Sequence, residues 1–164
     1  MSFSLIAATV SISLALVFYT LGVFNERRKG TLTKGNVALF WAGFAFDTAG
    51  TSIMTAMAVA GGSSALGMHA LSGVFAIALM AIHATWATLT FVRKNEKAMA
   101  KFHSFSIVVW LFWLMPYTLG ILQGVPLLHF ANLQAGIVAL AVVGGVAAVV
   151  YFSGRSNGKV KNIR

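Results

Sequence analysis

The sequence lacks cysteine altogether and has only three acidic residues and two prolines among its 164 residues. Without cysteine the chain forms no disulfide, and neither an iron–sulfur cluster nor thiolate-bound zinc can be held within it. Charged residues make up 9% of the chain and hydrophobic residues 59%, with a mean hydropathy of +0.85. A water-soluble globule needs more polar surface than this composition supplies. The composition therefore indicates a protein that is solvated by membrane lipid.

The twelve Lys and Arg residues give a formal net charge of +9, and they are not spread evenly along the chain. They fall into three clusters, within residues 27–34, 93–101 and 155–164. Between the clusters lie apolar stretches long enough to cross a hydrocarbon core, which takes roughly 20 helical residues. A basic surface for nucleic acid would show a patch or stripe on a folded domain. The clustering instead indicates loops at a membrane, and no nucleic-acid partner is expected.

The apolar stretches predict an all-α fold, a single bundle of five transmembrane helices over residues 1–153, followed by a basic tail over 154–164. Gly30 and Gly35 break the helical pattern in the connection between the first two helices, and Pro116 predicts a kink in the fourth helix. The helices are expected at about 3–24, 36–59, 66–92, 102–125 and 128–152.

With five crossings, the three basic clusters share one side of the membrane and the two uncharged turns share the other. Cytoplasmic loops carry an excess of Lys and Arg. The sequence therefore predicts a multi-pass protein with its N-terminus outside and its C-terminus in the cytoplasm.

Ionisable groups inside a membrane are costly, by roughly 2.5–3.5 kcal/mol for an Asp at a helix centre. The candidates here are Asp47, His69, His83, His103 and His129. His69 and His83 are fourteen residues apart, so on one helix they lie about 40° from eclipsed and about 21 Å apart. This arrangement would let one helix offer an axial imidazole to each of two haems. Two unrelated histidines can share a face by chance, so ordinary polar contacts of the two side chains are the alternative to haem ligation.

A second axial ligand must come from another helix at a similar depth. His129 and His69 are both expected near the outer surface and form one candidate pair. His103 is expected near the cytoplasmic end, whereas His83 lies deeper. Their pairing requires the fourth helix to begin earlier than residue 102 or the third to project from the membrane. Otherwise the two histidines have different partners.

Asp47 is expected at about the depth of His83, and a contact between them is predicted. The carboxylate would then orient a haem-ligating imidazole, or the two would form a structural pair. Asp47 can instead bond to a neighbouring hydroxyl such as that of Thr48 or Thr51. A different class of function, a small proton- or cation-coupled permease or channel, would use Asp47 and the histidines of the third helix. It is suggested by a polar run in the second helix, made of Asp47, Thr48, Thr51, Ser52 and Thr55.

Several short motifs between about residues 15 and 120 resemble the HsmA-type family of small membrane proteins, which is named for haem sensing. The matching motifs are Ala15-Leu16-Val17-Phe18-Tyr19 with Gly22-Val23 and Glu26-Arg27, Phe46-Asp47-Thr48 with Gly50-Thr51, His83-Ala84 with Trp86-Ala87, and Phe102-His103 with Phe105-Ser106 and Trp110. The family's ligands would map to His69, His83 and His103, while His129 depends on the depth argument alone. One departure is Asn36, where the family pattern has a histidine.

The resemblance implies a protein of the bacterial cytoplasmic membrane that binds haem and limits haem toxicity and oxidative stress. The histidines leave open one or two haem b groups. One accessible haem would favour sequestration, whereas two at different depths would favour a b-type cytochrome oxidoreductase. In the second role it would pass electrons across the bilayer, with quinone or superoxide as a reaction partner. Lipid and haem are the expected partners, and a homo-oligomer is left open.

Overall fold

The computed structural model of the chain describes residues 2–62, 68–94, 96–124 and 130–161. Within these ranges the regular structure is helical, and the predicted five helices are confirmed. Several boundaries differ from the prediction. The first helix continues past residue 24 and the fourth begins well before residue 102, whereas the fifth begins after residue 128 and continues into the predicted tail. The helices are α1 (Phe3–Lys29), α2 (Lys34–Ala60), α3 (Met68–Arg93), α4 (Glu96–Gly124) and α5 (Asn132–Lys161).

The connection between α1 and α2 is set by local hydrogen bonds. Gly30 has a φ of 66°, a left-handed conformation that ends α1 at little cost for glycine. Thr33 caps α2, because its hydroxyl accepts from the backbone N–H of Asn36 while the Asn36 side chain accepts from the backbone N–H of Thr33. The Asn36 amide also donates to the carbonyl of Gly22, at 2.9 Å. Asn36 thus ties the first turn of α2 to α1.

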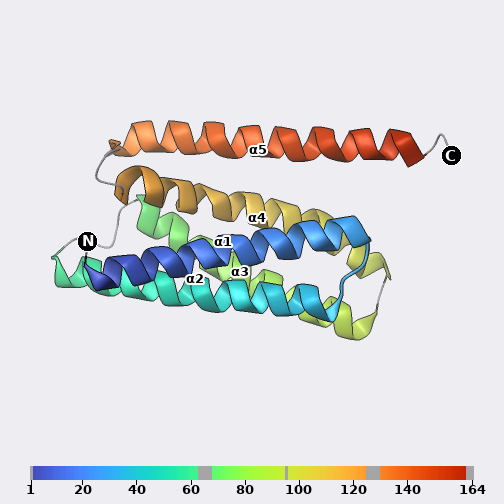
Figure 1. Ribbon diagram of the computed structural model, residues 1–164, viewed down its shortest axis with the longest axis horizontal. Helices are drawn as coiled ribbons and strands as arrows, with labels where there is room; N and C mark the ends of the chain where they lie inside the picture. Colours follow the sequence, from blue (N-terminus) through green and yellow to red (C-terminus); the bar gives the residue numbers. More distant parts are fainter. Residues whose placement is uncertain (1, 63–67, 95, 125–129, 162–164) are drawn as a thin grey trace.

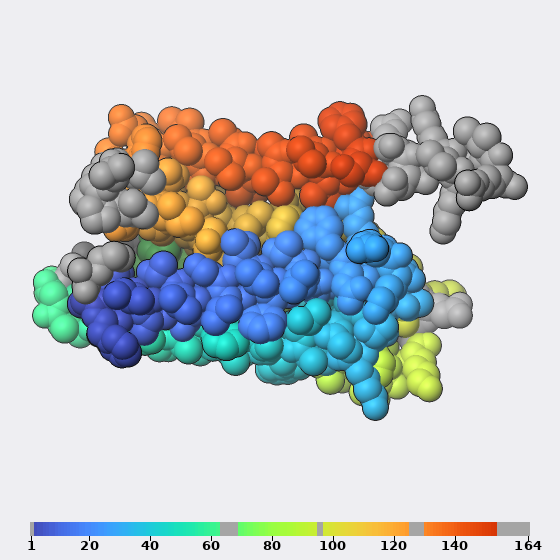
Figure 2. All heavy atoms as spheres, in the orientation of Figure 1, coloured from blue at the N-terminus to red at the C-terminus, as the bar shows by residue number. Residues whose placement is uncertain are grey.

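The five helices run alternately in opposite directions, so that α1 begins at one end of the bundle and α5 ends at the other (Figure 1). Helix α1 packs against α2 and α4, and α3 packs against α2 and α4. Helix α5 lies along α4, and atoms of α4 are visible between α5 and α1 in Figure 2. A side-chain contact also joins α1 to α5, because the Arg27 guanidinium donates to the carbonyl of Val150 at 3.0 Å.

Helices α1 and α2 approach closely because large side chains of one pack over glycines of the other. A Cβ on Gly43 would lie 2.6 Å from the Tyr19 ring, and one on Gly22 would lie 2.5 Å from the Phe40 ring. The contacts repeat at Gly50, which faces Ile12. Small residues allow this approach in lipid, where dispersion and hydrogen bonds hold helices together.

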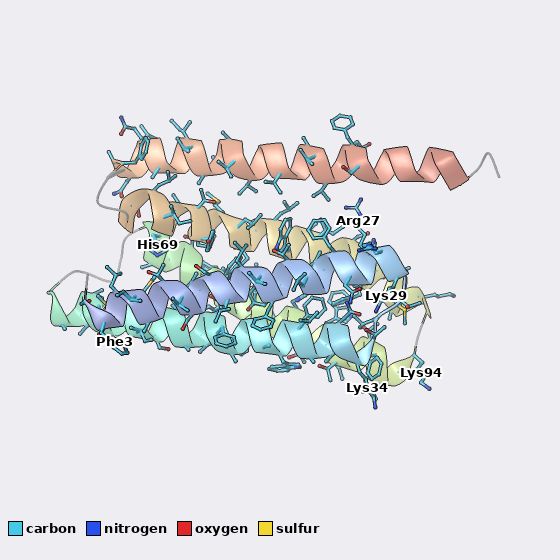
Figure 3. All side chains as sticks on the ribbon, in the orientation of Figure 1. Phe3, Arg27, Lys29, Lys34, His69 and Lys94 are labelled. Atoms are coloured by element: carbon cyan, nitrogen blue, oxygen red, sulfur yellow. The ribbon has the colours of Figure 1, made fainter. Side chains whose placement is uncertain are left out.

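All five helices are long and apolar enough to cross a membrane. Apolar side chains also cover the outside of the bundle: Val17 is 49% exposed, Ile82 55% and Leu140 60%. A bundle with this surface suits a lipid environment better than water. The labelled basic residues Arg27, Lys29, Lys34 and Lys94 gather at one end, whereas Phe3 and His69 lie towards the other (Figure 3). We refer to these as the basic end and the His69 end.

Candidate functional site

Both described histidines of α3 face α4. His69 lies against Gly120, and His83 bonds to Ser106. Fourteen residues separate the histidines, and fourteen also separate their two α4 partners, as expected for an antiparallel pair of helices. The predicted shared face is therefore confirmed, with a separation of about 21 Å along α3.

His83 occupies a closed position between three helices. The residue is only 1% exposed, and its Nε2 lies 2.9 Å from the Ser106 hydroxyl oxygen. Its ring centroid is 4.4 Å from that of Phe40 and is stacked at 5.1 Å on that of Phe102. Its Nδ1 is buried, with no hydrogen-bond partner among the described residues. Iron could reach this ring only if an aromatic side chain or Ser106 moved aside.

His69 lies beside a cavity of about 310 Å³ at the His69 end of the bundle. Side chains from four helices surround this cavity, among them Leu5 on α1, Met54 and Met57 on α2 and Gln123 on α4.

The His69 ring can border the cavity because Gly120 has no side chain, since a Cβ there would lie 2.9 Å from the ring carbon Cε1. Nδ1 is buried and has no hydrogen-bond partner among the described residues. Nδ1 of His83 is in the same state, so the feature that sets His69 apart is its place beside the cavity. Of the described histidines, His69 is the one that borders this cavity.

His103 is paired with the carboxylate of Glu26, which in the sequence stands out only as part of the Glu26-Arg27 motif. Its Nδ1 lies 3.0 and 3.1 Å from the two oxygens of Glu26. The Glu26 side chain is 1% exposed and that of His103 33% exposed. Glu26 was overlooked because it precedes the basic run that starts at Arg27, although it is one of only three acidic residues.

His83 and His103 do not form the pair considered from the sequence. Helix α4 does begin earlier than expected, at Glu96, but the two rings have different partners: Ser106 for His83 and Glu26 for His103. His83, on α3, bonds to a residue of α4, whereas His103, on α4, bonds to a residue of α1. His129, the fourth candidate, lies outside the described residues.

The predicted hydrogen bond between Asp47 and His83 is wrong. The Asp47 carboxylate accepts from the Trp113 indole N–H at 2.8 Å and from the Tyr19 hydroxyl at 3.3 Å. The α2 residue that meets His83 is Phe40, two turns nearer the basic end. Asp47 is 3% exposed, so its two donors replace the water that a buried carboxylate loses.

The polar run of α2 does not line a single path through the bundle. Asp47 is buried, whereas Thr48, Ser52 and Thr55 are exposed on the outside of the helix. The Thr48 hydroxyl donates to the carbonyl of Phe44 in its own helix, at 2.8 Å. This geometry gives the permease hypothesis no support beyond the presence of the buried carboxylate.

Comparisons of the chain with protein-family models, curated proteins and solved structures found no match. Among the described residues, no group of three or more His, Cys, Asp or Glu side chains is placed to hold a metal ion. A haem iron needs only one or two protein ligands, because the porphyrin supplies the other four.

Proposed function

We propose that the chain is a haem-binding integral membrane protein in which His69 is an axial ligand of haem b. The cavity beside His69 is the observation that carries the proposal. It brings together apolar walls and the His69 imidazole, for which the missing side chain of Gly120 leaves room. Neutral imidazole is a common ligand of haem iron, and ligand sites are mostly apolar with few polar groups.

The residues around the cavity would each have a simple task. His69 would hold the iron, and its packing against Gly120 would orient the ring. Leu5 and the two methionines would keep water from the bound group. When bound, haem supplies one-electron chemistry at its iron. The protein would set the potential through the ligands and the apolar surroundings.

If a second haem binds nearer the basic end, His103 is better suited than His83 to hold it. Glu26 engages Nδ1 of His103, which leaves Nε2 for iron, and carboxylates orient metal-ligating imidazoles in this way. His83 is enclosed by Phe40 and Phe102, and Ser106 engages its Nε2. One haem at the His69 end fits sequestration, whereas two haems at different depths fit electron transfer between quinone and an acceptor such as superoxide.

In the membrane, the basic end would face the cytoplasm and the His69 end would face outward, because Lys and Arg are enriched in cytoplasmic loops. The N-terminus would then lie outside and the C-terminus inside. The resemblance to the HsmA-type family suggests the bacterial cytoplasmic membrane as the location.

The proposal is tested by the visible absorption spectrum of the full-length protein, purified in detergent and supplied with haem. We expect a Soret band that shifts on reduction, and we expect His69→Ala to lose or greatly weaken haem binding at the His69 end. His83→Ala is the matched control, since it removes a histidine that Phe40, Phe102 and Ser106 enclose. Equal haem uptake by wild type and His69→Ala would exclude His69 as the ligand.

A further inference from the structure

Two methionines share the cavity with His69. Met54 and Met57 are three residues apart on α2, so they lie on the same face of that helix. Both are partly buried and both line the cavity, which His69 borders from α3. The two thioether side chains and the His69 imidazole therefore line one space, from two different helices.

The other described lining residues have little to offer a metal. Leu5, Gly120 and Gly124 have no ligating side-chain atom. The Gln123 amide nitrogen already donates to Asn132, at 2.8 Å. A thioether binds haem iron together with histidine in cytochromes of the His/Met type. Methionine also has three rotatable side-chain bonds, so its sulfur can adjust to a ligand that enters the cavity.

We propose that the iron of a haem held by His69 takes its sixth ligand from the sulfur of Met54 or Met57. This inference rests on the proposed function. It gives the site His/Met axial ligation, which raises the reduction potential relative to ligation by two histidines. The soft thioether favours ferrous iron, so the site would be an electron acceptor at the His69 end of the bundle. A haem at the His69 end then needs no second histidine.

The test uses the full-length protein loaded with haem b, with Met54→Leu, Met57→Leu and the double variant. Leucine conserves most of the volume, so the cavity walls are kept. We expect one single variant and the double variant to retain haem through His69 but to change from six-coordinate low-spin to high-spin ferric haem. The ferric thioether charge-transfer band should disappear in the same variants. Met115→Leu is the matched control, because Met115 packs near the same end without lining the cavity.

A variant with a replacement ligand shows whether a lost low-spin spectrum reflects the lost ligand or a general disturbance of the site. Histidine in place of the ligating methionine should restore a low-spin spectrum and shift the midpoint potential downward. Unchanged spectra and potentials in both leucine variants and in the double variant would overturn the thioether ligand while leaving haem binding intact. Absence of haem from the wild-type protein would overturn the proposed function itself, so the two failures are distinguishable.

Discussion

Replacement of Asp47 by alanine should destabilise the bundle, because it leaves two buried donors without their acceptor. The Tyr19 residue is 1% exposed and Trp113 3% exposed, so water cannot readily replace the carboxylate. A side-chain hydrogen bond between membrane helices contributes about 0.6 kcal/mol on average and up to about 1.7. An unsatisfied buried donor costs about 1–3 kcal/mol. For the two donors together we expect a loss of about 2–3 kcal/mol, partly offset by removal of a buried charge.

The free energy of unfolding can be measured by titration with a denaturing detergent in mixed micelles, followed by circular dichroism. Asp47→Asn should lose only about 1 kcal/mol, since the amide oxygen still accepts from the Trp113 indole. Thr48→Ala is the control, because Thr48 is exposed and bonds only to its own helix backbone. Neither Asp47 variant is expected to shift the haem potential, as the carboxylate bonds to neither His69 nor His83.

A double-mutant cycle separates the hydrogen bond from general packing. Tyr19→Phe should cost about 1 kcal/mol in the wild-type chain and close to nothing in the Asp47→Ala chain, where the hydroxyl has already lost its acceptor. If Tyr19→Phe costs the same in both backgrounds, the bond between Tyr19 and Asp47 does not contribute and the reasoning is refuted.

Three further predictions concern the topology and the helix contacts. The chain has no cysteine of its own, so single cysteines can be introduced at Thr31 and Gly61, two exposed positions. An impermeant maleimide should label the cysteine at position 31 only from the cytoplasm and the one at position 61 only from outside. Labelling of both from the same side would exclude the five-crossing topology. Gly43→Ala should lose about 1–3 kcal/mol of stability, because its Cβ would meet the Tyr19 ring at 2.6 Å, whereas Gly73→Ala, with open space, should lose none; unfolding titrations showing equal effects would contradict the packing account. Glu26→Ala should destabilise the contact between α1 and α4 by about 1–3 kcal/mol, and less in a His103→Ala background; additive losses in the same assay would mean that the pair contributes nothing.

The helices and the shared histidine face could be predicted because they follow from local regularities. Apolar stretches separated by basic clusters give the number of helices, and the helical period places His69 and His83 on one face whatever the neighbours are. The start of α4 could not be predicted, because charged residues such as Lys97 and Lys101 are typical of a connector between helices. Charged residues at the end of a long helix can project beyond the apolar region without ending it.

The partners of the polar groups could not be predicted, because they depend on how the helices pack. Depth estimates placed Asp47 beside His83, yet a difference of two turns brings Phe40 there instead. The bond between Glu26 and His103 joins residues 77 positions apart, and no local pattern marks it. The cavity beside His69 arises from four helices and from the absence of a side chain at Gly120.

The haem-to-protein ratio of the purified full-length chain, from a pyridine haemochrome assay and quantitative amino-acid analysis, tests the central claim most directly. The account predicts at least one haem b per chain in the wild-type protein and one fewer in His69→Ala, with the secondary structure preserved by circular dichroism. A wild-type protein that is folded, supplied with haem and yet free of it would contradict the account.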